Sequence, residues 1–167
     1  MSNAATSSPR WDPAFIADVI KAYDVRGLVD EQITVDFVRA VGQSFSRLMR
    51  SEGALSVVVA HDMRDSGPEL AEAFAEGVTE QGLNVINIGL ASTDEMYCAS
   101  GLLQVPGAMF TASHNPAAYN GIKLCRAGAR PVGQDTGLAT ISQELAEGVP
   151  ESNGAHGHVT NLSLIHI

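Results

Sequence analysis

Short apolar runs rich in β-branched residues alternate with amphipathic segments along this chain. Residues 55–60, with Val57, Val58 and Val59 at their centre, form too short a run for a helix and predict a strand covered on both faces. The preceding segment, 34–52, instead repeats its apolar side chains at helical spacing. Further strands are predicted at 84–90, 107–111 and 121–126, an extended segment at 20–25, and further helices at 66–81, 92–103 and 135–147. This alternation predicts the α/β class: a layered domain with a mostly parallel, mixed sheet between helices.

The length allows one such domain with a real core. The 167 residues are 45% hydrophobic and 17% charged, as in ordinary globular proteins. We expect a disordered lead at 1–12, the α/β domain at 13–149 and a linker at 150–161. Residues 162–167 match a translated sequencing adaptor, so we expect them to be a non-native tail, with a natural apolar tail as the alternative.

The distribution of charge limits the partners. A net charge of −9, with no Lys/Arg run, disfavours a nucleic acid or an anionic membrane as partner.

Residues 1–10 lack a hydrophobic signal core, and no run approaches the roughly 18 apolar residues of a membrane helix, so we expect the protein to be cytoplasmic. The two cysteines, Cys98 and Cys125, lack zinc spacing and predict buried, reduced thiols without a metal. The few cations gather near glycine-rich segments, which favours a small anionic ligand.

Two serines have the spacing of helix N-caps. Ser66 stands three residues before Glu69, and Ser92 stands three residues before Glu95. This spacing predicts that helix N–H groups engage both hydroxyls, which makes neither serine a candidate nucleophile.

The segment 112–121 is different, because it combines a serine, a histidine, asparagines and glycine with almost no apolar side chain. Asn-Pro and Asn-Gly are ordinary turn pairs, so a purely structural loop is one interpretation. The other is phosphoryl transfer, because Lys123 follows on a strand and could place an ammonium near Ser113. A Ser-His hydrolase is disfavoured, since neighbouring residues on an extended chain point in opposite directions and His114 is poorly placed as a base for Ser113.

Three motifs in order resemble those of the α-D-phosphohexomutase superfamily. Residues 111–116 followed by 119–123 resemble its active-site serine loop, in the form found in bacterial phosphomannomutase/phosphoglucomutase. Residues 23–27 (Tyr-Asp-Val-Arg-Gly) resemble its amino-terminal signature, and 62–68 resemble its second loop. The resemblance covers residues 20 to 150 and implies the fold of the first phosphohexomutase domain.

The resemblance also implies roles for individual residues. Ser113 would carry the transferable phosphate, and Lys123 would be the general acid/base. His114 would join the catalytic loop, which it would shape with Asn115. The residues expected to contact substrate or phosphoserine are Tyr23, Arg26, Asn115 and Arg64.

The implied reaction moves phosphate between the 1 and 6 positions of a hexose phosphate, with hexose 1,6-bisphosphate as intermediate and activator. The family binds Mg²⁺ through the phosphoserine, here Ser113, and an aspartate-rich loop of its second domain, which this chain lacks. The chain therefore holds the nucleophile without the other domains that complete the site, and we expect it to fold but to be inactive alone. A phosphoglucosamine mutase domain and a non-catalytic, truncated anion-binding domain are the alternatives. A nucleotide-binding module is disfavoured because no Walker or G-x-G-x-x-G sequence follows a predicted strand.

Overall fold

The computed structural model describes residues 8–163. Its helices are α1 (Pro13–Val19), α2 (Val35–Ser51), α3 (Gly67–Glu80), α4 (Thr93–Leu103) and α5 (Leu138–Glu147), with a 3-10 turn at Gln134–Thr136. Its strands are β1 (Val25–Leu28), β2 (Ser56–His61), β3 (Asn84–Leu90), β4 (Gly107–Phe110), β5 (Tyr119–Arg126), β6 (Arg130–Pro131) and β7 (Val159–Asn161). Within the described range, no helix has both the length and the apolar character needed to cross a membrane.

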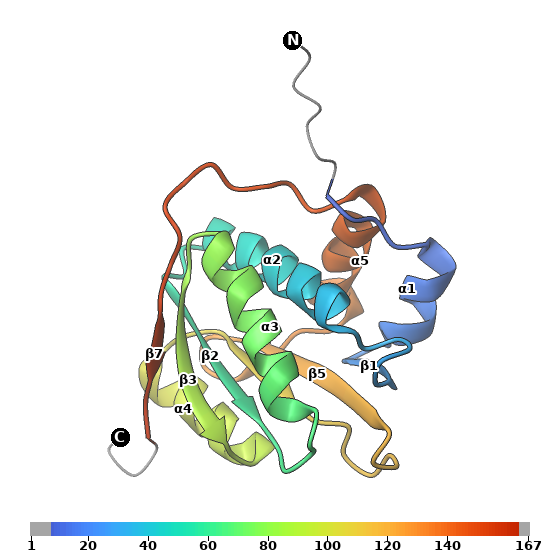
Figure 1. Cartoon of the computed structure of the whole chain (residues 1–167). Coiled ribbons are helices and arrows are strands. Elements are labelled where there is room, and N and C mark those ends of the chain that lie inside the picture. The colour runs from blue at the N-terminus through green and yellow to red at the C-terminus, as the bar shows by residue number, and fades with distance from the viewer. Residues whose placement is uncertain (1–7, 164–167) are drawn as a thin grey trace.

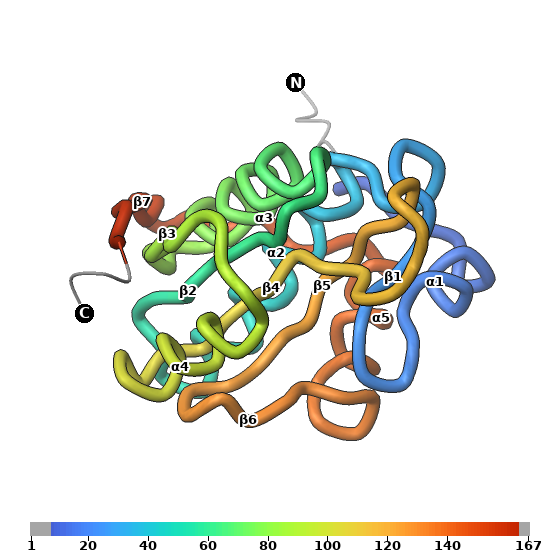
Figure 2. The backbone as a smooth tube through the Cα atoms, turned by 90° about the horizontal axis from the view of Figure 1, so that it is seen from below, coloured from blue at the N-terminus to red at the C-terminus, as the bar shows by residue number. Residues whose placement is uncertain are grey.

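The strands form one mixed sheet, as the alternation predicts. Its order is β1-β5-β4-β2-β3-β7, with β6 beside β5. Strands β4, β2, β3 and β7 are parallel, whereas β5 pairs antiparallel with β4, β1 and β6. Helices α2 and α3 lie side by side on one face (Figure 1), and α4 lies on the opposite side of the sheet from α3 (Figure 2). The α/β layered fold is therefore confirmed.

Two apolar clusters fill the layers. The larger one packs α1, α2, α3 and α5 against one face of the sheet, and the smaller one packs α4 against the other face. Helices α2 and α3 approach each other closely at two glycines: a Cβ on Gly77 would lie 2.1 Å from the Arg39 carbonyl oxygen, and one on Gly42 would lie 2.4 Å from that of Phe74. Any larger side chain at these positions would force the helices apart.

The parallel strands bring three loops to one edge of the sheet. His61 at the end of β2 pairs with Leu90 at the end of β3 and with Phe110 at the end of β4. The segments that follow these strands therefore meet at the carboxyl edge, where ligands of open α/β sheets bind.

The amino-terminal region is more ordered than expected. Helix α1 begins after Asp12, whose carboxylate accepts a hydrogen bond from Ala14 N at 2.7 Å, and Pro13 is its first residue. Trp11 packs edge-to-face on Phe37 at 5.6 Å. Residues 8–12 thus differ from the expected disordered lead, whose residues 1–7 lie outside the described range. The Asp-Pro pair was the available signal for this short helix.

The last three residues of the expected linker, 150–161, form a strand. Strand β7 pairs with β3, and the following Leu162 packs against the smaller apolar cluster. Residues 164–167 of the expected tail lie outside the described range. A three-residue edge strand is too short to leave a periodic signal, so only its pairing identifies it.

The two cysteines differ in their exposure to solvent. Cys125 is buried as expected, and burial raises the pKa of its thiol, which keeps it protonated. Cys98 is exposed, which corrects the expectation of two buried thiols.

Candidate functional site

The serine loop, residues 111–118, connects β4 to the antiparallel strand β5. Its base is tied by Thr111 N, which donates to the Gly121 carbonyl at 3.1 Å. Two turns fold the loop: Asn115 N donates to the Ala112 carbonyl, and Tyr119 N donates to the Pro116 carbonyl, both at 3.0 Å. The turn-forming residues of the segment thus account for its local shape.

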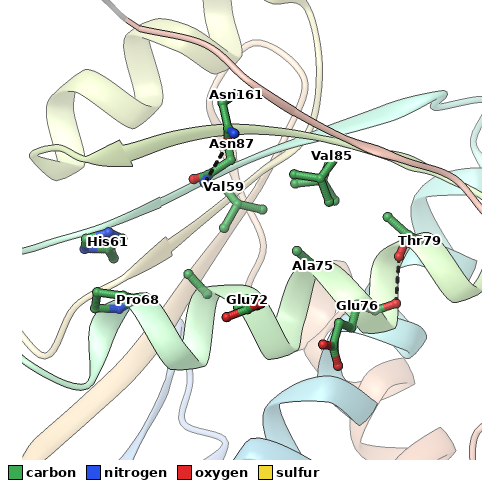
Figure 3. A pocket seen from close by; sticks show the side chains of 12 residues that line it. Val59, His61, Pro68, Glu72, Ala75, Glu76, Thr79, Val85, Asn87 and Asn161 are labelled. Atoms are coloured by element: carbon green, nitrogen blue, oxygen red, sulfur yellow. Dashed lines mark hydrogen bonds between the residues drawn. The ribbon is translucent and has the colours of Figure 1, made fainter.

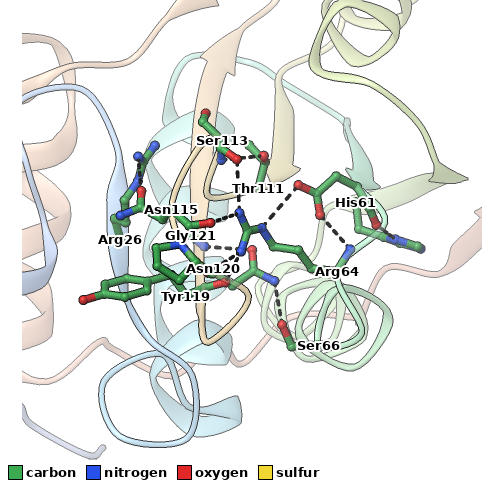
Figure 4. A network of polar contacts seen from close by, with 12 residues as sticks. Arg26, His61, Arg64, Ser66, Thr111, Ser113, Asn115, Tyr119, Asn120 and Gly121 are labelled. Atoms are coloured by element: carbon green, nitrogen blue, oxygen red, sulfur yellow. Dashed lines mark hydrogen bonds and ion pairs between the residues drawn. The ribbon is translucent and has the colours of Figure 1, made fainter.

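A side chain from another loop holds this segment. Arg64, which follows β2, donates from Nη1 to the carbonyl oxygens of Pro116 and Tyr119 at 2.7 and 2.9 Å. Its Nη2 donates to the carbonyl oxygens of Ser113 and Asn115 at 3.1 and 2.8 Å (Figure 4). One guanidinium therefore binds four backbone carbonyls of the serine loop and its end.

Arg64 is itself held by the preceding aspartate. Asp62 Oδ1 accepts a hydrogen bond from Arg64 N at 3.1 Å, and Asp62 Oδ2 lies 3.6 Å from Arg64 Nε. The Arg64 side chain is only 8% exposed. This geometry does not favour the predicted contact of Arg64 with a substrate phosphate, because both Nη groups are already engaged by the protein.

Ser113 lies where the loop is most constrained. Its φ of 50° is in the left-handed region, which costs a residue other than glycine roughly 1–2 kcal/mol. Its backbone N–H donates to Thr111 Oγ1 at 3.2 Å, and its carbonyl binds Arg64. The side chain is exposed, and its hydroxyl has no hydrogen-bond partner within residues 8–163. The main chain of Ser113 is therefore fixed while its hydroxyl stays available.

The two predicted N-cap serines behave differently. Ser92 accepts a hydrogen bond from Glu95 N, and its own N–H donates to the Glu95 carboxylate, so this capping box is confirmed. Ser66 makes no side-chain cap, so that prediction is wrong. Its hydroxyl instead accepts a hydrogen bond from Asn120 Nδ2 at 2.8 Å, which joins the start of α3 to the end of the serine loop. Sequence spacing favoured the local partner, but the buried Asn120 amide takes the hydroxyl.

Arg26 reaches the serine loop from β1. Its Nη1 donates to Asn115 Oδ1 at 2.7 Å, and its Nη2 pairs with Asp24 at 2.6 Å. The buried Nε of Arg26 has no hydrogen-bond partner among the described residues. The side chain is 25% exposed. Arg26 is thus fixed beside the loop by its two Nη groups.

Lys123 lies on the same face of the sheet as Arg26. Ile122 and Leu124, its neighbours along β5, belong to the larger cluster, so alternation directs Lys123 toward the α4 side. Arg26 pairs directly with Gly121, two residues before Lys123, which makes Arg26 and Lys123 diagonal neighbours with Cα atoms roughly 7–8 Å apart. No ion pair or hydrogen bond of the Lys123 side chain occurs in the described part of the chain.

Two predicted residues stand apart from this network. Tyr23 is 78% exposed, and its ring lies beside Gly133. His114 is exposed, and its ring makes no hydrogen bond to another described residue. The hydrogen-bond network of the loop therefore includes Ser113, Asn115, Arg26 and Arg64, but not the side chains of Tyr23 and His114.

The described residues do not bring together a set of magnesium ligands. They contain no group of three or more His, Cys, Asp or Glu side chains that could hold a metal ion. Magnesium requires several hard oxygen donors, and Ser113 would offer only those of one phosphate. The residues present therefore do not fit a complete magnesium site.

Away from the serine loop, a cavity lies between α3 and the edge of the sheet (Figure 3). Val59 and Val85 contribute to its apolar floor, whereas Glu72 and Glu76 come from α3. Its lining contains no lysine or arginine. This cavity therefore does not favour a phosphate. A separate groove lies beside Ser113, and its lining includes Arg64 and Asn115.

Comparisons with known proteins show which family this chain is similar to. The model of the family described as "Phosphoglucomutase/phosphomannomutase, alpha/beta/alpha domain I" matches residues 17–150. The chain is 42% identical over 130 residues to a "Phosphomannomutase" of Vibrio cholerae, which covers 76% of this chain and 28% of that protein. It is also 42% identical over 135 residues to "Phosphohexose mutases" of Xanthomonas campestris, with 80% and 28% covered.

A solved structure gives the same result. A phosphoglucomutase/phosphomannomutase family protein from Burkholderia thailandensis matches with a TM-score of 0.81 at 27% identity, over 93% of this chain and 34% of that one. The chain spans 28% of the length of the two curated relatives.

Proposed function

The chain belongs to the phosphoglucomutase/phosphomannomutase family, and we propose that it forms the phosphoserine-bearing first domain of an enzyme that interconverts hexose 1-phosphate and hexose 6-phosphate. The observation that carries this proposal is the free hydroxyl of Ser113 on a backbone held from several sides. Figure 4 shows the Ser113 side chain pointing away from Arg64. A fixed main chain with an accessible oxygen suits a group that receives and donates phosphate, since phosphoryl transfer depends mainly on positioning and charge stabilisation.

In the proposed reaction, the phosphoryl group passes from Ser113 Oγ to the 6-hydroxyl of a hexose 1-phosphate. The serine O–P bond breaks as the new P–O bond forms, and the serine oxygen regains a proton. The proton of the sugar hydroxyl passes to Nζ of Lys123, the proposed general base, and from there to the serine oxygen. Lys123 lies on the same face of the sheet as Arg26. The resulting hexose 1,6-bisphosphate then returns its other phosphate to Ser113 and leaves as hexose 6-phosphate.

The charge of Arg26 beside the loop would stabilise the transferred phosphate. Its Nη1 binds Asn115 of the loop at 2.7 Å, and its side chain is 25% exposed. The names of the relatives favour mannose phosphates as substrates. Magnesium needs ligands that the described residues do not bring together, so we propose that this chain contributes to it only the phosphate on Ser113.

We further propose that the 167-residue chain has no mutase activity by itself. It spans 28% of the length of the Vibrio cholerae and Xanthomonas campestris relatives, and the described part supplies neither a set of metal ligands nor a closed sugar pocket. A coupled assay with mannose 1-phosphate, magnesium and hexose 1,6-bisphosphate should show no conversion. Conversion that is abolished by Ser113→Ala would contradict this proposal.

The proposed phosphoserine is tested in a mutase that contains this chain as its first domain. The protein is incubated with labelled hexose 1,6-bisphosphate, and the labelled peptides are mapped. We expect label on the peptide that contains Ser113, and no label in Ser113→Ala. Ser66→Ala and Ser92→Ala are the matched controls and should retain the label. Label on a peptide without Ser113 would overturn the assignment.

A further inference from the structure

We propose that Arg64 is a positioning residue: its buried guanidinium sets the backbone conformation of Ser113 and thereby the direction of the phosphate-accepting hydroxyl. This inference rests on the proposed function of Ser113. Arg64 does not contact the transferred group in this arrangement, because its Nη atoms face the main chain of the loop.

The four acceptors of Arg64 span the loop. Nη2 binds the carbonyls of Ser113 and Asn115, and Nη1 binds those of Pro116 and Tyr119. These bonds cross 49 to 55 positions of the sequence, from the loop after β2 to the segment between β4 and β5. The contacts therefore hold both the serine itself and the return of the chain into β5.

The shape of the side chain matters more than its charge. A guanidinium is planar and donates in several fixed directions, whereas an ammonium has a single nitrogen. A lysine in place of Arg64 would keep the positive charge but could not bind all four carbonyls in the same geometry. The loop carbonyls would then lose partners that no sheet ladder replaces, because residues 111–118 lie outside the strands.

The conformation of Ser113 makes this support necessary. Its φ of 50° is unfavourable for serine, so surrounding contacts have to hold it. The Ser113 carbonyl, bound by Arg64, and the Ser113 N–H, bound by Thr111, fix the two peptide groups on either side of its Cα. Loss of the Arg64 contact should let this peptide rotate and turn the hydroxyl away from its productive direction.

Asp62 supports Arg64 in this position. It contacts both the backbone N–H and the Nε side of Arg64, and it follows β2 directly. The guanidinium is therefore oriented from a rigid strand of the sheet. A site supported in this way keeps its geometry better than one that depends on an exposed loop alone.

The test compares Arg64→Lys with Arg126→Lys in a mutase that contains this chain as its first domain. Arg126 is a matched control, because it is also partly buried and hydrogen-bonded, to Glu52, but lies at the opposite end of β5 from the loop. We expect Arg64→Lys to lower kcat about a hundredfold, the cost of a misplacement of about 1 Å, with little change in KM. Arg126→Lys should retain kcat, and the two variants should have similar melting temperatures.

Two further readouts separate positioning from folding. Amide hydrogen exchange in residues 112–119 should accelerate in Arg64→Lys but not in Arg126→Lys. In Arg64→Ala, added guanidinium ion should restore part of the lost kcat, and ammonium ion should not. Equal kcat values in the two lysine variants, or a folded Arg64→Ala that guanidinium does not rescue, would overturn the proposal.

The experiment also distinguishes this proposal from the proposed function. If the unsubstituted protein places no phosphate on Ser113, the proposed function fails. If it does so, and Arg64→Lys matches it in kcat and in loop exchange, only the positioning role fails. If Arg64→Lys does not fold, Arg64→Ala is refolded in the presence of guanidinium ion. Recovery of kcat would support the positioning role. No recovery would show that Arg64 serves only general stability, which overturns the proposal.

Discussion

The loops after β3 and β4 begin at the same edge of the sheet but are held in different ways. After β3, Ser92 and Glu95 bond reciprocally at 2.6 and 3.1 Å, and the chain enters α4 at once. After β4, the serine loop turns back into the antiparallel β5, and Arg64 holds it from 49 to 55 positions away. The first loop is stabilised by its own residues, and the second depends on a distant side chain.

This difference separates a structural serine from a reactive one. The Ser92 hydroxyl accepts a hydrogen bond from the Glu95 N–H of the helix it caps, whereas the Ser113 hydroxyl is free because Arg64 and Thr111 bind only its main chain. A loop can therefore present a side chain for chemistry when other residues supply its rigidity. Four predictions test this comparison.

The largest expected effect is on stability at the base of the serine loop. A Cβ on Gly121 would lie 2.2 Å from the Val25 carbonyl oxygen, so Gly121→Ala should lower the free energy of unfolding by about 3 kcal/mol. Gly101→Ala in α4, where a Cβ meets nothing within 4 Å, should instead raise it by about 0.5–1 kcal/mol. Urea denaturation measures both, and equal stabilities would contradict the role given to the β1–β5 contact.

The next effect is on catalysis. In a mutase that contains this chain, Lys123→Met should lower turnover about a hundredfold without unfolding the protein, since it removes a proton-transfer group that has no structural partner in the described range. Lys21→Met, at the only other lysine, is the control and should leave turnover unchanged. Near-normal turnover of Lys123→Met would reduce Lys123 to a structural or surface residue.

A smaller effect on stability should distinguish the role of the Ser113 backbone conformation from the role of its hydroxyl. Because its φ is positive, Ser113→Gly should be more stable than Ser113→Ala by about 1–2 kcal/mol. Both variants should fail to take up phosphate from hexose 1,6-bisphosphate. Denaturation midpoints measure the difference, and a glycine variant no more stable than the alanine variant would argue against a left-handed Ser113.

The smallest effect should occur in the loop after β3. Ser92→Ala should lower the free energy of unfolding by about 1 kcal/mol, whereas Ser92→Asp, which can still cap α4, should retain stability. Phosphate uptake should be unaffected by either change. An equal loss of stability in the two variants would show that the hydroxyl does not act as a cap.

Much of this architecture follows from local patterns. The β-branched run around Val58 predicts a covered strand, and it became β2 at the centre of the sheet. The spacing of Ser92 and Glu95 predicts a capping box, which is confirmed. The same rule failed at Ser66, because Asn120, 54 positions away, takes its hydroxyl. Periodicity and caps depend on interactions over a few residues, so the sequence states them directly.

The sequence by itself determined the α/β class, the family and the candidate nucleophile Ser113. Only the tertiary structure decided how that serine is held: it directed Arg64 into four loop carbonyls, brought Arg26 to Asn115, and placed Lys123 on the face of the sheet that Arg26 shares. The physical reason is that every residue has the same backbone carbonyl group, so the residue types do not show which carbonyls will be bound. A sequence can name the donor, but the peptide oxygens that it binds become known only when the chain has folded.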